Sequence, residues 1–233
     1  VACQGIEGAY SQIACDRLFR NPDIEYVRSF EDVFRAVESG ACSYGILPIE
    51  NSIHGTVIAV YDLMKNYNFH IIKSVKLKIN HVLMANAGAK LGDIKEIISH
   101  EQALGQCSKF MKDYPDIRIT ICENTAVAAK LVSDSGRNDI AAISSPDCAE
   151  IYGLSILDDN VANSDSNFTR FICIAKDLLI YPGADRISII MNLPHTPGAL
   201  NSTISKFATA GLNLTKLESR PIAGRDFEFT FYF

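Results

Sequence analysis

The 233-residue chain is 48% hydrophobic and 21% charged, a composition typical of globular proteins that bury a sizeable core. Its formal net charge of −5 argues against a nucleic-acid binder, because a phosphate backbone calls for clustered Lys and Arg. No apolar run reaches the roughly 20 residues that a membrane span requires.

The cysteines indicate a reduced compartment. They are Cys3, Cys15, Cys42, Cys107, Cys122, Cys148 and Cys173. Their number is odd, they are scattered through apolar segments, and no CxxC pair suggests a zinc site or a redox motif. Since no signal peptide is visible either, we expect small buried hydrophobic residues in a cytoplasmic protein.

Strand-like and helical runs alternate over the first 176 residues. The predicted strands are Val1–Cys3, Glu25–Val27, Tyr44–Ile49, Lys73–Ala85, Glu96–Ser99, Ile117–Glu123, Ile140–Ser144 and Asn167–Ala175. The predicted helices are Ser11–Phe19, Phe30–Ser39, Val57–Tyr67, Gln102–Lys112, Ala126–Ser133 and Asp147–Tyr152. Asn51 and Ser52 are expected to start the third of these helices. This alternation predicts an α/β fold with mainly parallel sheets.

The pattern changes near residues 178–185, where Tyr181-Pro182-Gly183 indicates a turn and a linker. The predicted elements that follow are strand Arg186–Leu193, helix Ala199–Ala210 ended by Gly211, and strands Asn213–Arg220 and Asp226–Phe233. The order β-α-β-β is the first two-thirds of a ferredoxin-like βαββαβ unit. We therefore predict a first domain over 1–177, a linker over 178–185 and an incomplete second domain over 186–233. Because both ends of the chain are strand-like, we also expect a fragment of a longer polypeptide.

Polar residues gather at the carboxyl ends of predicted strands, where open α/β sheets bind ligands. The stretch Gln4–Ser11 places two glycines and the hydroxyl of Ser11 before a helix, which offers backbone N–H groups to an anion. The alternative is a plain turn with Ser11 as N-cap. In Leu47–Gly55, a buried strand ends in Glu50, Asn51 and Ser52. These residues either line a site or cap the next helix and face solvent.

Two further stretches have the same character. In Ser99–Leu104, His100 is a candidate proton carrier or an ordinary residue at a helix start. HExxH is absent and no His or Cys stands at metal-ligand spacing, so no metal is expected. In Asn167–Phe171, Thr169 and Arg170 lie between two aromatics. Arg170 suits bidentate binding of a carboxylate, and the alternative is a surface Arg on an edge strand.

Six motifs together resemble the prephenate dehydratase family. They are the Gly-rich opening through Ser11, Pro48–Ser52 (PIENS), Ser99–Leu104 (SHxQAL), Thr169–Phe171 (TRF), Gly198–Leu200 (GAL) and Glu218–Pro221 (ESRP). Their order matches the family across essentially the whole chain. The resemblance implies a catalytic domain similar to type II periplasmic binding proteins, with two α/β lobes of roughly residues 1–75 and 76–176. Strands would cross between the lobes near Lys76–Val82 and Asn167–Ile174. An ACT domain of ferredoxin-like fold, here incomplete, would follow.

The resemblance implies decarboxylating dehydration of prephenate to phenylpyruvate, CO₂ and water, without any cofactor. It assigns the contact with the departing hydroxyl to Thr169. An alcohol is too weak an acid to supply the proton alone, so we expect Thr169 to be a positioned hydrogen-bond donor aided by His100 or Glu50. The full set of candidate catalytic residues is Thr169, Arg170, Glu50, Asn51, Ser52, His100, Gln102 and Ser11.

The resemblance also implies regulation by L-phenylalanine at an interface between paired ACT domains, in a homodimer or homotetramer. The implied residues are Gly198, Ala199, Leu200, Asn201, Glu218, Ser219, Arg220 and Pro221. Gly198 would let the backbone approach the ligand closely. The opening of the chain is similar to fused chorismate mutase–prephenate dehydratases, which agrees with a start inside a longer polypeptide.

Two alternatives stay open. The first is arogenate dehydratase. Its substrate, arogenate, differs from prephenate only by an amine in place of the keto group, and the sequence does not show which of the two substrates is used. A non-catalytic sensor that holds an aromatic metabolite on a periplasmic-binding-protein-like fold belongs to a different functional class. Turnover of substrate decides between an enzyme and a sensor.

Overall fold

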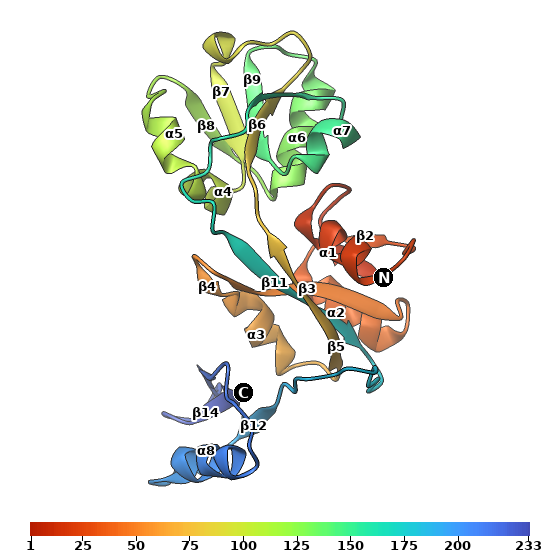
Figure 1. The fold of residues 1–233 in the computed structure, drawn as a ribbon, viewed down its shortest axis with the longest axis vertical. Coiled ribbons are helices and arrows are strands. Elements are labelled where there is room, and N and C mark those ends of the chain that lie inside the picture. The colour runs from red at the N-terminus through yellow and green to blue at the C-terminus, as the bar shows by residue number, and fades with distance from the viewer. The chain divides into compact units, whose positions relative to one another are not determined.

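The computed structural model describes residues 1–233, which divide into two compact units, Val1–Leu179 and Ile180–Phe233 (Figure 1). This division lies inside the predicted linker 178–185. None of the helices is both long enough and apolar enough to cross a membrane.

The first unit contains two sheets. The first sheet has the order β2-β1-β3-β11-β5, with β4 paired to β3. Its strands are β1 (Ala2–Gln4), β2 (Glu25–Val27), β3 (Tyr44–Asn51), β4 (Gly55–Thr56), β5 (His70–Lys78) and β11 (Phe168–Ala175). The strands β1, β2 and β3 pair in parallel, whereas β11 pairs antiparallel with both β3 and β5. Because β11 returns to this sheet from far along the chain, it brings residues near 169 beside residues near 51.

Three helices cover the first sheet: α1 (Tyr10–Leu18), α2 (Phe30–Ser39) and α3 (Ile58–Met64). Helix α1 packs Ala14 and Cys15 against Leu77 and Phe171 on one face. Helix α2 covers the other face, and Ser29 and Asp32 form a capping box at its start.

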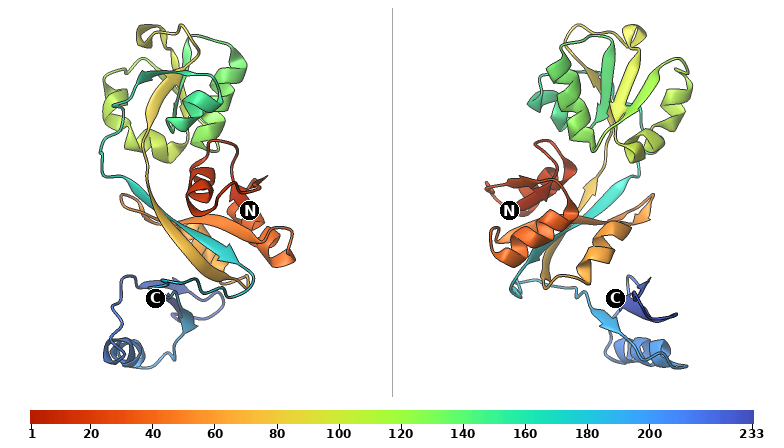
Figure 2. Two further views of the ribbon diagram at one scale, coloured as in Figure 1. Left: turned by 45° about the vertical axis from the view of Figure 1, so that its right-hand side comes forward. Right: turned by 180° about the vertical axis from the view of Figure 1, so that it is seen from behind.

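The second sheet has the order β10-β6-β9-β7-β8. Its strands are β6 (Val82–Ala85), β7 (Glu96–Ser99), β8 (Arg118–Ile121), β9 (Ile140–Ser144) and β10 (Ser155–Asp158). The helices around it are α4 (Glu101–Gln106), α5 (Ser108–Lys112), α6 (Thr125–Ser135) and α7 (Asp147–Ile151), with a 3₁₀ turn over Leu91–Asp93. Apolar clusters fill both of its faces. Two segments connect the two sheets, one before β6 and one before β11, as Figure 2 shows in gold and teal.

The prediction of mainly parallel sheets is wrong, because both sheets are mixed. The predicted strand Lys73–Ala85 is two strands, β5 and β6, which belong to different sheets. They separate at Asn80, whose backbone N–H donates to the Tyr10 hydroxyl (3.0 Å) while its carbonyl accepts from the same hydroxyl. A side chain 70 positions away therefore replaces the ladder bonds that would continue the strand.

The predicted helix Gln102–Lys112 is also interrupted, at Cys107. The side-chain amide of Asn163 donates to the Gly105 carbonyl (3.1 Å) and accepts from the Lys109 N–H (2.9 Å). These two backbone groups would bond to each other in a continuous helix. The interruption therefore comes from a residue on a distant loop.

The cysteines are mostly part of the hydrophobic core. Six of the seven are buried, Cys122 is half-buried, and all are free thiols. Burial raises the pKa of the Cys107 and Cys173 thiols to about 12, so both stay protonated at neutral pH. The predicted reduced cytoplasmic compartment stays a prediction.

The second unit is a three-stranded antiparallel sheet with one helix. Its strands are β12 (Ile190–Asn192), β13 (Glu218–Pro221) and β14 (Phe229–Tyr232), and their order in the sheet is β12-β14-β13. Helix α8 (Ala199–Thr209) connects β12 to β13. Gly211 has a left-handed φ of 70° just past the end of α8, as expected of a glycine at that position. All three strands are shorter than the sequence predicted.

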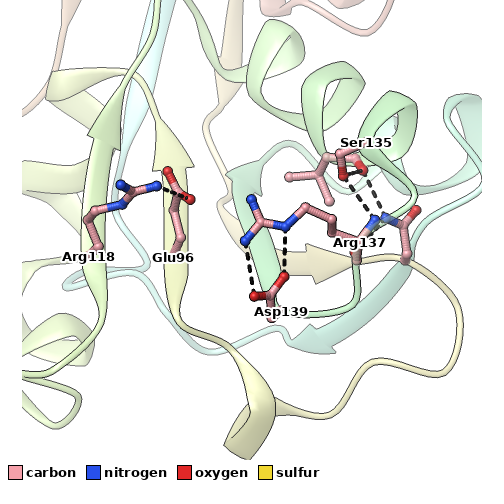
Figure 3. Close-up of polar contacts among 7 residues, drawn as sticks. Glu96, Arg118, Ser135, Arg137 and Asp139 are labelled. Atoms are coloured by element: carbon pink, nitrogen blue, oxygen red, sulfur yellow. Dashed lines mark hydrogen bonds and ion pairs between the residues drawn. The ribbon is translucent and has the colours of Figure 1, made fainter.

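A polar cluster lies where β7 and β9 begin. Figure 3 shows Arg118 reaching from β8 to Glu96 on β7, beside a bidentate pair between Arg137 and Asp139. Glu96 is buried and accepts from the Thr120 hydroxyl (2.6 Å) and from Arg118 (2.5 Å). These bonds, first that of Thr120, lower the pKa of the Glu96 carboxyl.

We expect Glu96→Gln to lower the free energy of unfolding at pH 7 by about 1–3 kcal/mol, because one donor loses its acceptor. A carboxyl with a lowered folded pKa stabilises the fold above its unfolded pKa, and the stabilisation disappears as pH falls through the folded pKa. Urea unfolding should thus show wild type and variant converging in acid. A smaller loss is expected for Asp139→Asn, whose carboxylate is partly exposed. If the difference in unfolding free energy between wild type and Glu96→Gln stayed the same in acid, this role of Glu96 would be contradicted.

Candidate active site

Thr169 and Asn51 lie opposite each other on neighbouring strands. They are register partners in the β11–β3 ladder. Thr169 is buried, and its Oγ1 lies 3.0 Å from Asn51 Nδ2. The predicted hydroxyl and the predicted amide thus form one hydrogen-bonded pair.

The orientation of the Asn51 amide follows from its other contacts. The backbone N–H groups of Ile53 and His54 donate to Asn51 Oδ1 at 2.9 and 3.0 Å. Since an N–H group only donates, the atom that receives both bonds is the oxygen, and the Nδ2 group faces Thr169. Thr169 Oγ1 therefore accepts from Asn51, and its own hydrogen remains available to donate to a ligand. The expectation that Asn51 starts a helix is wrong, because its side chain closes a turn and α3 begins at Ile58.

The amide pair continues into a longer network. Asn51 Nδ2 donates to Asn167 Oδ1, Asn167 Nδ2 donates to Gln106 Oε1, and His81 Nε2 lies beside the same Gln106 oxygen, each at 2.8 Å. His81 is buried, and its Nδ1 has no hydrogen-bond partner. Burial lowers the pKa of His81, which favours the neutral ring. His81 and Gln106 lie outside the candidate stretches of the sequence, and Asn167 opens one of them without an assigned role. The local signal for His81 was the polar pair Asn80-His81 inside an apolar run.

Arg170 and Glu50 lie on the opposite face of the sheet from Thr169. Successive residues of a strand point to opposite faces, and Phe171, two residues after Thr169, packs on the α1 side. Arg170 consequently faces the α2 side, where its guanidinium pairs with Glu50 at 3.7 Å. Arg170 and Glu50 were expected beside Thr169 in one catalytic site, and the structure does not bring them together with it.

Ser52 and Ser11 have different environments. The Ser52 hydroxyl donates to the Ser166 carbonyl (3.2 Å) and accepts from the Phe168 N–H (2.9 Å), so it holds the start of β11. Ser11 lies buried in the first turn of α1, on the same side of the sheet as Thr169. The alternative reading of Ser11 as the N-cap is wrong, because the N-cap is Ala9.

His100 and Gln102 lie at the carboxyl end of β7. His100 is the N-cap of α4, and its Nδ1 accepts from the Gln102 N–H at 3.3 Å. Burial lowers the pKa of His100. The parallel pairing of β7 with β9 places His100 level with Ser144, the last residue of β9. The hydroxyl of the next residue, Ser145, donates to the glycine-rich loop between β1 and α1 (residues 5–9). His100 therefore lies at the edge where the two sheets meet.

The glycine-rich loop joins the two sheets. The Gly8 carbonyl accepts from the Ser145 hydroxyl (3.2 Å) and the Cys148 thiol (3.4 Å), and the Glu7 carbonyl accepts from the Tyr152 hydroxyl (2.5 Å). Gly8 has a φ of 85°, and a Cβ there would lie 2.6 Å from Cys148 Sγ. This position therefore requires glycine both for its backbone and for the space.

We expect Gly8→Ala to lower the free energy of unfolding by several kcal/mol, about 1 from the left-handed backbone and about 1–3 more from the clash. Gly40→Ala is the matched control, since Gly40 has a φ of 81° with nothing within 4 Å of the added Cβ. Urea titrations of both variants measure the difference. Equal losses of unfolding free energy in the two variants would mean that Cys148 moves away from the added Cβ without destabilising the fold.

The residues proposed to bind phenylalanine lie in the second unit. Gly198 is the N-cap of α8 with a φ of 83°, and Ala199, Leu200 and Asn201 form the first turn of that helix. Glu218, Ser219, Arg220 and Pro221 make up β13. Asn192 at the end of β12 and Arg220 near the end of β13 both pair with Thr230 of β14, so these two strands end at the same edge of the sheet. The shared role of the two groups stays a prediction.

Comparison with known proteins agrees with this geometry. The family model described as "Prephenate dehydratase" matches residues 1–178. "Arogenate dehydratase/prephenate dehydratase 2, chloroplastic" of Arabidopsis thaliana is 38% identical over 95% of this chain and 58% of its own length. The "Bifunctional chorismate mutase/prephenate dehydratase" of Escherichia coli (strain K12) is 32% identical over 100% of this chain and 62% of its own. The chain thus spans less than two thirds of these relatives.

Two solved structures have similar folds. A protein described as "GqqA- a novel type of quorum quenching acylases" has a TM-score of 0.87 and 29% identity, over 99% of this chain and 85% of its own. The prephenate dehydratase of Arthrobacter aurescens, in complex with L-Phe, has a TM-score of 0.85 and 27% identity, over 100% of this chain and 79% of its own. From the family match and these likenesses, the chain belongs to the prephenate dehydratase family.

Proposed function

We propose that the chain catalyses the decarboxylating dehydration of prephenate to phenylpyruvate. In this reaction the ring C–O bond and the bond to the ring carboxylate both break, the electron pair of the latter enters the ring, and CO₂ leaves. The departing hydroxide takes up a proton and leaves as water. The observation that carries the proposal is the direction of the Asn51–Thr169 bond, which leaves the Thr169 hydrogen available to the departing oxygen.

Thr169 acts as a fixed hydrogen-bond donor rather than as an acid, because an alcohol holds its proton too tightly. A donor already in place stabilises the charge that develops on the leaving oxygen. His100, at the edge where the sheets meet, is our candidate for supplying the proton. The substrate carboxylates are expected near the amino end of α1, where Ser11 lies and where the N-cap Ala9 has no side chain that caps the helix.

A second reading gives Thr169 the role of a nucleophile in the hydrolysis of an amide, and it is motivated by the likeness to the protein described as a quorum quenching acylase. A nucleophilic hydroxyl needs a neighbouring base that takes its proton. The side chain that contacts Thr169 Oγ1 is the Asn51 amide through its N–H group, which cannot accept a proton. This contact favours a donor role for Thr169, and hence dehydration.

Side-by-side assays with prephenate and arogenate test the proposal. We expect turnover of prephenate, measured by the absorbance of the phenylpyruvate that forms. Exclusive use of arogenate would keep the reaction class and change the substrate. A folded chain that binds either compound without turnover would instead support the non-catalytic sensor.

We further propose that the second unit corresponds to the β-α-β-β portion of an ACT domain that responds to L-phenylalanine in a dimer or tetramer. Its strands have the order β12-β14-β13 in the sheet, and α8 connects β12 to β13. The first three strands of a ferredoxin-like unit have this same arrangement. Phenylalanine inhibits only if it binds a less active arrangement more tightly. Titration of phenylalanine during turnover should therefore lower the rate, and an unchanged rate would remove this role.

A further inference from the structure

The network behind Thr169 has a single allowed direction. Each amide in it could be turned by 180°, but the two backbone N–H groups that donate to Asn51 Oδ1 fix the first one. Asn167 must then present its oxygen to Asn51 and its nitrogen to Gln106. Gln106 Oε1 is consequently an acceptor, and the neighbouring His81 Nε2 must carry a hydrogen.

The network also ties together the parts of the first unit. Gln106 ends α4 beside the second sheet, Asn51 ends β3 in the first sheet, and His81 and Asn167 lie on the two connecting segments (Figure 1). The Ile79 N–H donates to the Asn167 carbonyl at 2.8 Å, which joins these segments directly. The side chains of the network therefore keep their positions only if the two sheets keep theirs.

His81 is the last residue of this hydrogen-bond network, counted from Thr169, and its burial lowers the stability of the fold. A buried polar atom without a partner costs about 1–3 kcal/mol, and His81 Nδ1 is such an atom. A leucine or phenylalanine would fill the same space without that cost. The Nε2–H bond to Gln106 is the one polar contact of the ring that offsets it.

We propose that His81 is a positioning residue of the active site, held as the neutral Nε2–H tautomer, whose bond to Gln106 keeps the amide chain in place and thereby keeps the Thr169 hydrogen directed at the substrate. The effect on the reaction rests on the proposed function. The tautomer and the direction of the amides do not depend on it.

Two variants of His81 distinguish a role in positioning Gln106 from a role in packing the core. Glutamine places its amide nitrogen near the position of Nε2 and can still donate to Gln106, whereas the shorter asparagine places its amide near Nδ1 and cannot. We expect His81→Asn to lower kcat roughly tenfold with KM within about twofold, the loss of one hydrogen bond that acts on the transition state. His81→Gln should recover most of kcat. His70→Asn, on an exposed histidine of β5, is the control and should leave kcat unchanged.

Equal losses in the two His81 variants would overturn the proposal, as would a loss in KM alone. If His81→Asn does not fold, Gln106→Glu and Gln106→Met give the same comparison, since only the first keeps an acceptor for His81 and Asn167. Equal rates in that pair would likewise overturn it.

Nitrogen NMR of the histidine rings tests the network without any assay. The chain has five histidines, and the signals that disappear in His81→Gln belong to His81. We expect a protonated Nε2 and a non-protonated Nδ1 at neutral pH. A protonated Nδ1 would contradict the network even in an active enzyme. A chain that turns over neither substrate but shows the Nε2–H tautomer would refute the proposed function and leave the network standing.

Discussion

Replacement of Thr169 by alanine is expected to lower kcat for prephenate by roughly a hundred- to thousandfold, the usual loss when a fixed donor to a developing negative charge is removed. KM should change little, because the bond strengthens mainly as the C–O bond breaks. Steady-state assays at saturating substrate measure both constants. The residue is buried at a strand pairing, so the thermal unfolding of the variant must be compared with that of wild type.

Two further substitutions at Thr169 separate the hydroxyl from the shape of the side chain. Thr169→Ser keeps the hydroxyl and should retain part of the activity. Thr169→Val keeps the branched shape without the donor, and should be as inactive as alanine while unfolding at a similar temperature to wild type. A valine variant with wild-type kcat would place the donor elsewhere.

The second large effect is expected from Asn51→Asp, although the side chains have the same shape. The carboxylate still accepts from the N–H groups of Ile53 and His54, but it offers no hydrogen to Thr169. The Thr169 hydroxyl would then donate to residue 51 and turn its hydrogen away from the substrate. We expect kcat to fall on the order of a hundredfold, as for loss of the donor itself.

Asn66→Asp is the matched control, because Asn66 is an exposed residue at the end of α3 that contributes nothing to the site. It introduces the same negative charge and should leave kcat unchanged. A fall in kcat in both aspartate variants would indicate a general effect of charge. An Asn51→Asp variant with full activity would show that the direction of the Asn51 bond is irrelevant to catalysis.

The alternation of strands and helices could be predicted because local patterns carry it. The strands Glu96–Ser99 and Ile140–Ser144 have the predicted bounds, since short apolar runs between turns leave few other choices. The pairing of strands could not be predicted in the same way. The antiparallel insertion of β11 between β3 and β5 depends on a chain return that no local period records.

The interruptions between α4 and α5 and between β5 and β6 could not be predicted from the sequence, and the reason is physical. Asn163 separates α4 from α5, and Tyr10 separates β5 from β6, in each case through hydrogen bonds from a residue far along the chain. Helical or strand propensity in the interrupted segments is intact. The competing partner is visible only once the fold has brought it there.

The candidate site was predicted in part. Family motifs named Thr169 and Asn51, and the register places them in contact. The same motif put Arg170 next to Thr169, yet adjacency on a strand means opposite faces. His81 was missed because a single histidine within an apolar run has no spacing signal, and its partners Gln106 and Asn167 come from distant elements.

The role of Asn51 in directing the Thr169 hydroxyl is tested most directly by a double-mutant cycle on kcat with Thr169→Ala, Asn51→Asp and the two combined. If Asn51 acts by directing the Thr169 hydroxyl, removal of that hydroxyl leaves Asn51 nothing to direct. The double variant should then be no slower than the slower single variant. If the two losses multiply, so that kcat of the combined variant is roughly ten thousandfold or more below wild type, the two residues act independently and Asn51 does not act through Thr169.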